Sequence, residues 1–163
     1  KKVAFAGPYY NSGAAIMVKA DDDSIKTVDD LNGKTVATEA NSTAVLALQK
    51  FAPQATPLLF QEDAQCVAAV QQGRAAAYVL DQAILISDAS TNPAVKVVGE
   101  PFTQEPYGIG VPLADPTAKQ FVNDWLTKIY ADGSWAKLWS ATVGTVVKGD
   151  PPATPKLGSV EGS

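Results

Sequence analysis

Short runs of strand-forming residues alternate with runs of helical periodicity between residues 14 and 98, and this alternation limits the fold more than any other feature. The sequence predicts strands at residues 14–19, 35–38, 57–60, 77–80 and 95–98, and helices at residues 24–31, 42–51, 63–72 and 82–89. Strands and helices in alternation, joined by short connections, indicate a doubly wound parallel sheet. The runs Thr35-Val36-Ala37 and Tyr78-Val79-Leu80 do not alternate in polarity, which is typical of strands covered on both faces. The predicted fold class is therefore α/β.

The pattern changes after residue 99. Residues 100–106 are polar and extended because two prolines restrict them, and residues 107–111 predict another strand. The longest predicted helix covers residues 116–131, with Asp115 as its N-cap and Pro116 in its first turn. Its predicted apolar face consists of Phe121, Val122, Trp125, Ile129 and Tyr130. A second helix is expected to be capped by Ser134, and the Pro-, Gly- and Ser-rich residues from 144 onward predict a tail.

Three side chains of the helix at residues 42–51 are expected to face the core, namely Val45, Leu46 and Leu48. The aromatic residues are expected to pack rather than to bind a ligand. Tyr9, Tyr10 and Tyr107 flank the predicted chain crossings, and Trp125, Trp135 and Trp139 follow one another at helical spacing.

Composition excludes several kinds of site. The chain contains no His and a single Cys, Cys66, so a His-ligated metal site, a thiolate cluster, an internal disulfide and Ser-His or Cys-His catalytic pairs are excluded within it. Cys66 lies in an apolar helical stretch and is expected to be a small buried core residue. The net charge of −4, without any block of Lys and Arg, argues against nucleic acid as a partner. No run reaches the roughly 18 apolar residues of a membrane-spanning helix.

Five short segments carry recognisable motifs: V-A-F-A-G-P-Y-Y at residues 3–10, D-L-N-G-K-T-V-A at 30–37, G-R-A-A-A-Y-V-L-D at 73–81, E-P-Y-G-I-G-V at 105–111 and A-D-G-S-W at 131–135. In this order and at this spacing, they resemble the polar amino-acid-binding proteins of solute-binding family 3. Ala76 departs from the family pattern, which usually has Asp at that position. The resemblance covers residues 3–143 and implies a type II periplasmic-binding-protein fold, which has two lobes.

The resemblance also implies an organisation of the chain into five parts. These are a first hinge crossing from lobe 1 at residues 1–12, a complete doubly wound lobe 2 at 13–99, a return hinge at 100–106, the C-terminal strand and helices of an incomplete lobe 1 at 107–143, and a tail at 144–163. Because the family places most of lobe 1 before the first crossing, we expect this chain to be the C-terminal portion of a longer protein. The missing N-terminal half of lobe 1 would then be one of its partners.

The residues Asn41-Ser42-Thr43 lie where a predicted strand turns into a helix. Unpaired N–H groups and the positive end of the helix dipole favour an anionic group there. Asn41 stands where the family usually has Gly, and Asn also accepts unusual backbone angles. The resemblance implies that Ser42 and Thr43 form a cradle for a carboxylate of the ligand. The alternative is that Ser42 only caps its helix.

Asp81 ends a buried predicted strand, where a carboxylate is costly unless something pairs with it. The resemblance implies that Asp81 accepts the α-ammonium group of the ligand, and the alternative is that it caps the following helix. Glu39 and Gln61 follow two other strands at the same edge of the sheet, where ligands bind in open α/β folds. We expect them to line the site; otherwise they belong to solvated loops.

The resemblance implies a substrate-binding component of an ABC amino-acid importer that closes two lobes on glutamate, aspartate or glutamine and presents the closed form to a permease. We expect no enzyme activity, no catalytic residue, no metal and no cofactor. The alternatives are an enzyme on the same fold, such as a cyclohexadienyl dehydratase, and an extracellular sensing domain. The expected location is extracytoplasmic, in the periplasm or on a cell-surface lipoprotein whose signal and anchor are absent from this chain.

Overall fold

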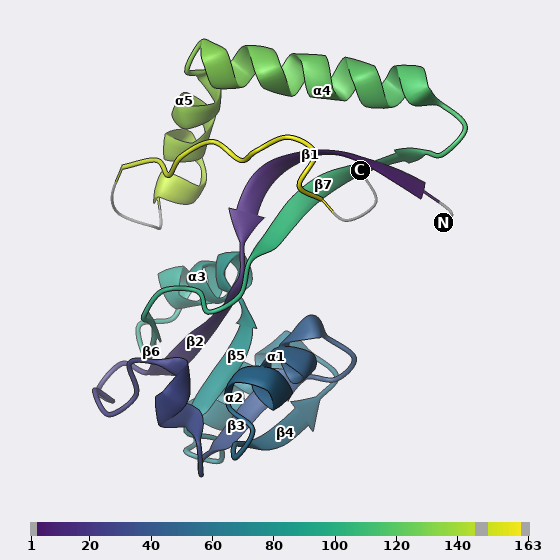
Figure 1. Ribbon diagram of the computed structural model, residues 1–163. Coiled ribbons are helices and arrows are strands. Elements are labelled where there is room, and N and C mark those ends of the chain that lie inside the picture. The colour runs from purple at the N-terminus through teal and green to yellow at the C-terminus, as the bar shows by residue number, and fades with distance from the viewer. Residues whose placement is uncertain (1–2, 146–149, 161–163) are drawn as a thin grey trace. The chain divides into compact units, whose positions relative to one another are not determined.

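The computed structural model describes residues 3–145 and 150–160, and the chain divides into two compact units (Figure 1). Unit 1 combines Lys1–Ser12 with Glu105–Ser163, and unit 2 is the continuous segment Gly13–Gln104. Each unit has its own sheet and its own buried core.

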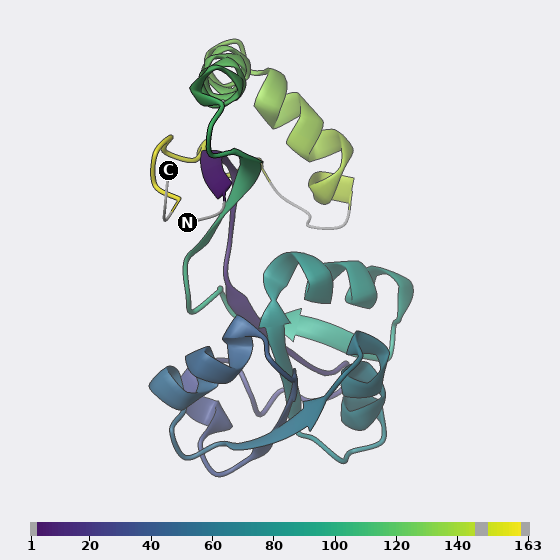
Figure 2. The same cartoon turned by 90° about the vertical axis from the view of Figure 1, so that its right-hand side faces the viewer.

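Unit 2 contains a five-stranded sheet in the order β4-β3-β5-β2-β6. Its elements are β2 (Ala14–Lys19), the 3₁₀ turn η1 (Val28–Leu31), β3 (Thr35–Glu39), α1 (Thr43–Phe51), β4 (Thr56–Phe60), α2 (Asp63–Gln71), β5 (Ala77–Asp81), α3 (Gln82–Thr91) and β6 (Val95–Val98). Because the right-handed crossovers from β3 and from β4 run in opposite directions along the sheet, α1 lies on one face and α2 and α3 lie on the other (Figure 2). The predicted α/β layering is therefore confirmed.

Two details of unit 2 differ from the prediction. The strands β3, β4 and β5 are parallel, but β2 runs antiparallel to both β5 and β6. The reason is that the connection from β2 to β3 contains only the short η1, whereas α1, α2 and α3 return the chain along the sheet between β3, β4, β5 and β6. The helix predicted at residues 24–31 shrinks to η1, because the Asp30 carboxylate accepts hydrogen bonds from the backbone N–H groups of Lys26 and Thr27 and holds both outside a helix.

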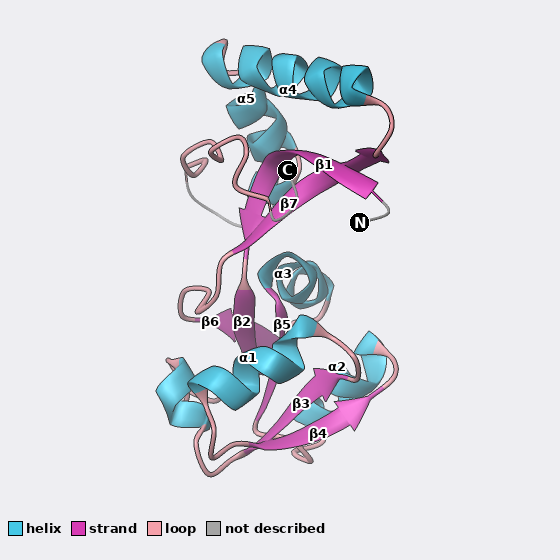
Figure 3. Cartoon of the chain, turned by 45° about the vertical axis from the view of Figure 1, so that its right-hand side comes forward, coloured by secondary structure: helices cyan, strands magenta, loops and turns pink. Residues whose placement is uncertain are grey.

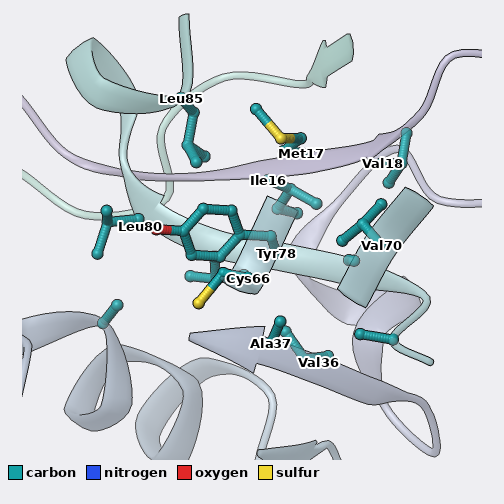
Figure 4. Close-up of a cluster of buried hydrophobic side chains, with 14 of the residues drawn as sticks. Ile16, Met17, Val18, Val36, Ala37, Cys66, Val70, Tyr78, Leu80 and Leu85 are labelled. Atoms are coloured by element: carbon teal, nitrogen blue, oxygen red, sulfur yellow. The ribbon is translucent and has the colours of Figure 1, made fainter. Parts of the chain in front are cut away.

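The core of unit 2 takes side chains from the strands and from the helices on both faces, and Figure 4 shows its centre around Tyr78 and Met17. Cys66 lies fully buried in it, as predicted. Of the three residues predicted for the inward face of α1, Leu48 is correct, whereas Val45 and Leu46 are each one position away from the residue that is buried. The helix buries Ala44, Ala47 and Leu48, whereas Leu46 is 66% exposed. Positions i, i+3 and i+4 share one helix face, so two alanines rather than the bulkier Val45 and Leu46 meet the sheet.

Unit 1 contains an antiparallel pair of strands, β1 (Val3–Ser12) and β7 (Glu105–Pro112), followed by α4 (Pro116–Ala131), α5 (Ser134–Ala141) and the 3₁₀ turn η2 (Val143–Thr145) (Figure 3). The Asp115 side chain accepts the Ala118 N–H at 2.9 Å, which confirms its predicted capping role. The prediction that Ser134 caps α5 is wrong, because the N-cap position is occupied by Gly133. Ser134 is the first residue of the helix, and its own N–H donates to the Asp132 carboxylate at 2.8 Å.

The core of unit 1 is small and consists of four buried side chains, namely Leu126, Ile129, Trp135 and Trp139. Predicted packing is confirmed for Trp135, whose indole N–H donates to the Tyr9 carbonyl at 2.8 Å. It is also confirmed for the tyrosines, because the Tyr107 ring meets the Tyr9 and Tyr10 rings edge-on. Phe121 and Trp125 are instead 72% and 47% exposed, because α4 turns its Leu126 and Ile129 stripe inward.

The C-terminal segment is bound to unit 1 and is not the free tail that the sequence predicts. The Gly158 N–H donates to the Gly7 carbonyl at 2.8 Å, and Leu157 packs against the unit 1 core. A Cβ atom placed on Gly108 would lie 3.0 Å from both methyl groups of Val160, so the segment approaches β7 closely because residue 108 lacks a side chain. Residues 146–149 and 161–163 of the predicted tail lie outside the described residues.

Within the described ranges, none of the helices combines the length and the apolar character that crossing a membrane requires.

Candidate functional site

The six residues predicted for the site all lie at one edge of unit 2, where the parallel strands β3, β4 and β5 end. They are Glu39, Asn41, Ser42, Thr43, Gln61 and Asp81. Hydrogen-bonded neighbours in a sheet are about 4.8 Å apart, so the ends of β3 and β5 place these residues side by side. The prediction that these residues share one edge of the sheet is therefore confirmed, and the binding role of each residue remains a prediction.

The turn from β3 into α1 has the backbone that the sequence predicts. Asn41 adopts a left-handed φ of 65°, the conformation for which Gly or Asn is needed. Ser42 occupies the N-cap position, but its hydroxyl donates backwards to the Glu39 carbonyl at 2.8 Å and makes no capping bond. Thr43 is the exposed first residue of α1. The positive end of this helix therefore opens at the sheet edge, where it favours an anionic group.

Asp81 is the last residue of β5 and the N-cap of α3. Its Oδ1 atom accepts the Ala83 N–H at 2.9 Å, so the capping alternative is confirmed. Capping fixes the side chain at the end of the strand, within the same edge as Thr43. A carboxylate held in this way can also accept a hydrogen bond from a cationic group of a ligand.

Glu39 and Gln61 differ in exposure. Glu39 ends β3 and is half-buried, whereas Gln61 follows β4 directly and is exposed. The pairing of Glu39 with Phe60 brings the two loops together at the edge. Both positions can therefore line a site there, and Glu39 is the more fixed of the two.

The structure adds a partly buried cluster that the sequence reasoning missed, made of the buried Tyr78 and the half-buried Asp63 and Asp88. The Tyr78 hydroxyl donates to Asp63 Oδ1 at 2.8 Å, and burial followed by this bond raises the pKa of Tyr78 above its ordinary value. Burial, followed by the nearby Asp63 and Glu39, raises the pKa of Asp88 to about 6. One signal was available, since a tyrosine in a fully buried strand needs a partner for its hydroxyl.

Cys66 lies next to this cluster, and its thiol is unreactive. Burial, followed by the negative charge of Glu39, raises the pKa of its thiol to about 12. A thiol of that pKa is protonated at neutral pH, so it is not a nucleophile. In the part of the chain that the structure describes, no three His, Cys, Asp or Glu side chains come together in a way that could hold a metal ion.

Comparison with known proteins places these features in a family. The sequence profile of the bacterial extracellular solute-binding proteins, family 3, matches residues 1–143. The chain is 33% identical to the glutamate-binding protein GluB of Corynebacterium efficiens, over 88% of this chain and 51% of that protein. It is 32% identical to the ABC transporter glutamine-binding protein GlnH of Bacillus subtilis (strain 168), over 85% of this chain and 51% of that protein. The chain thus spans about half the length of the curated relatives that it matches.

Solved structures agree with the sequence comparison. An ancestral arginine-binding protein bound to glutamine superposes with a TM-score of 0.72 at 34% identity, over 87% of this chain and 64% of that one. The type II periplasmic-binding-protein fold that the motifs imply is therefore confirmed. On these grounds the chain belongs to family 3 of the bacterial extracellular solute-binding proteins.

Proposed function

We propose that this chain is part of the substrate-binding component of an ABC amino-acid importer, and that the sheet edge of unit 2 contacts the ligand. The observation that carries the proposal is that the positive end of a helix and a negative carboxylate lie at the same edge of the sheet. The N-terminus of α1 at Thr43 favours a carboxylate, and the Asp81 carboxylate favours an ammonium group. An amino acid carries these two groups on one carbon atom, so a single edge can hold both.

The names of the relatives support an amino acid as the ligand, since they refer to glutamate and glutamine. Within this class we propose glutamate, aspartate or glutamine, because Thr43 adds a hydroxyl group at the start of α1 that suits a carboxylate or an amide oxygen. The Ser42 hydroxyl donates to the Glu39 carbonyl and would have to turn away from it to join Thr43. Solved neighbours are named for arginine, so arginine belongs in any test. The family also supports an extracytoplasmic location and a permease as partner.

The N-terminal half of lobe 1 is a further proposed partner. The chain covers 51% of GluB and 64% of the arginine-binding neighbour, which leaves room for it. Phe121 and Trp125, both exposed on α4, are the side chains that such a partner would cover. The binding test is therefore designed for a protein in which this half is restored.

The substitution Asp81→Asn tests the proposal, because asparagine keeps an oxygen for the Ala83 N–H and removes only the charge. Losing one partner of a desolvated charged hydrogen bond costs about 2–5 kcal/mol, so affinity should fall by about thirtyfold or more. Asp115→Asn is the matched control, since Asp115 caps α4 in the same way and lies in the other unit. Calorimetry with the common amino acids measures both variants.

An unchanged affinity of Asp81→Asn would remove Asp81 from the site. Absence of binding for every amino acid by the unsubstituted protein would contradict the proposed function as a whole. Turnover of prephenate or arogenate by the same protein would favour the enzyme alternative instead.

A further inference from the structure

A pocket of about 360 Å³ opens at the other end of the unit 2 sheet. Its lining consists of Lys19, Asp22, Lys34, Thr35 and the loop residues 73–76. Thr35 begins β3, whereas Glu39 ends that strand at the candidate amino-acid site. Each residue advances about 3.3 Å along a strand, so the pocket lies about 13 Å from the amino-acid edge. It is therefore a separate place on unit 2.

The lining of this pocket is positively charged in a chain whose net charge is −4. Lys19, Lys34 and Arg74 face one acidic residue, Asp22. Within residues 3–145 and 150–160, the structure has one ion pair, between Lys96 and Asp23. None of the three cations that line the pocket belongs to it. Their charge is available to an anion from outside.

Asp22 is ionised and offsets only one of the three positive charges that line the pocket. The Ser24 N–H donates to Asp22 Oδ1 at 2.7 Å. The hydrogen bonds from Ser24, followed by the charges of Lys34 and Lys96, lower the pKa of Asp22 and keep it ionised. One carboxylate against three cations leaves the pocket with a net positive charge.

The Lys19 ammonium group lies close to the end of α2. Gly73 follows α2 with a φ of +71°, and the Lys19 ammonium nitrogen lies 3.7 Å from the place where a Cβ atom on Gly73 would be. The C-terminal end of a helix carries partial negative charge and attracts a cation. The Lys19 ammonium group thus lies beside the loop that follows α2, at the pocket.

An anion in this pocket would be bound by charged side chains rather than by backbone N–H groups. The N–H groups of the loop are already used: Gly73 donates to the Val70 carbonyl at 3.0 Å, Arg74 and Ala75 donate to the Ala69 carbonyl, and Ala76 donates to the Thr35 carbonyl at 2.8 Å. Lysine ammonium groups bind phosphate oxygens as point charges. Arg74 also lines the pocket, but its side chain is exposed and extends toward Phe60 at the end of β4, with the guanidinium carbon 5.5 Å from the centroid of that ring. The two lysines are therefore the main cations for a phosphate group.

We propose that this pocket binds the phosphate group of a phosphate ester through Lys19 and Lys34, with Arg74 at its rim. A volume of about 360 Å³ is within the roughly 300–1,000 Å³ of small-molecule sites, so it has room for the organic part of the ester as well. A soluble phosphate ester and a phospholipid headgroup share this chemistry. The proposal does not depend on amino-acid binding at the opposite edge.

The test compares the double variant Lys19→Gln/Lys34→Gln with the double variant Lys119→Gln/Lys128→Gln, which removes the same charge from α4 in unit 1. Glycerol phosphate is titrated into the full chain while backbone amide resonances are recorded. The amides of residues 19, 34 and 73–76 should shift. Because a hydrogen bond to a charged group is worth about 1.5–3 kcal/mol, affinity should fall at least about tenfold in the pocket variant and stay unchanged in the α4 variant.

Vesicles of phosphatidylglycerol, with phosphatidylcholine vesicles as reference, separate the two sources of phosphate. Retention on the anionic vesicles that needs Lys19 and Lys34 identifies a headgroup, and binding of glycerol phosphate without retention identifies a soluble ester. The proposal is overturned if neither probe binds, or if both double variants lose affinity equally. It is also overturned if the pocket variant loses only thermal stability, since the lysines would then serve the end of α2 alone.

Discussion

Units 1 and 2 show what a sheet needs in order to be covered on both faces. Unit 2 has five strands, with α1 on one face and α2 and α3 on the other, and its core continues through all of them. Unit 1 has only the pair β1 and β7, and its core consists of four buried side chains. Two strands alone are marginal in water, whereas several strands packed against helices are stable. The exposed aromatic side chains on α4 are the visible result of that difference.

The largest expected effect comes from separating the units. Residues 13–104 should fold alone, because their core lies within the segment and the Ala14 N–H to Thr103 Oγ1 bond of 2.7 Å holds the two ends together. Residues 1–12 joined through a flexible linker to residues 105–163 should not fold cooperatively. Thermal melting followed by circular dichroism, together with amide resonance dispersion, measures both pieces.

A cooperative transition for the linked unit 1 piece would contradict this comparison, since its two strands and small core would then suffice. A unit 2 piece without a cooperative transition would also contradict the comparison, since residues 13–104 are expected to fold alone. The intact chain serves as the reference, with signals from both units.

A smaller effect is expected within unit 1, from two neighbouring positions of α4. Leu126 is fully buried, so Leu126→Ala should lower the free energy of unfolding of unit 1 by about 2–5 kcal/mol. Trp125 is 47% exposed, so Trp125→Ser should change this free energy by no more than about 0.5 kcal/mol. Chemical denaturation followed by tryptophan fluorescence of Trp135 and Trp139 measures both.

We expect the exposed apolar face of α4 to let copies of the chain associate with one another, because such a face favours a partner. Trp125→Ser removes part of this face and should weaken that association. Sedimentation at increasing protein concentration checks this. A strongly destabilising Trp125→Ser would mean that this face is covered within the chain itself.

The smallest effect is a pH dependence of stability in unit 2, which comes from Asp88. The pKa of Asp88 is raised from 3.8 to about 6 in the folded chain, by burial and then by the carboxylates of Asp63 and Glu39. The folded state therefore binds this proton more tightly than the unfolded state does. The stability that this proton contributes is fully present below pH 3.8 and is lost as the pH rises through about 6.

The substitution Asp88→Asn should remove this dependence and make the chain more stable than the unsubstituted protein at pH 7, but not at pH 4. Asp124→Asn, which removes an exposed carboxylate from α4, is the control. Melting temperatures across this pH range measure the difference. A constant offset between Asp88→Asn and the unsubstituted protein at every pH would contradict the assignment.

Local patterns predicted the elements of unit 2 well, because strand and helix periods depend on neighbouring residues. Residues 14–19 and 95–98 are strands with the predicted bounds. The direction of β2 was wrong because it depends on which strands it joins, and no local pattern records that choice. The inward faces of α1 and α4 were partly wrong for a similar reason, since bulk alone favoured Leu46 and Trp125 over Ala47 and Leu126.

The candidate site divides in the same way. Its edge could be predicted, because strand ends and a helix start at Thr43 are local features. The Tyr78 contact with Asp63 and the positive pocket around Lys19 could not, because they join residues from different elements. The bound C-terminal segment was missed because a Pro- and Gly-rich composition indicates a lack of helix and strand, not a lack of contacts.

The order of the chain through the two units has a consequence for its synthesis. Val3 pairs with Pro112, so β1 leaves the ribosome long before its partner strand, and the whole of unit 2 is made in between. At about 5–20 residues per second, this interval lasts for several seconds. Unit 2 can complete its sheet in that time, while β1 waits with unpaired edges that other nascent chains could pair with. Folding of residues 1–163 by themselves should therefore proceed from the middle outward, and the pairing of β1 with β7 should come last.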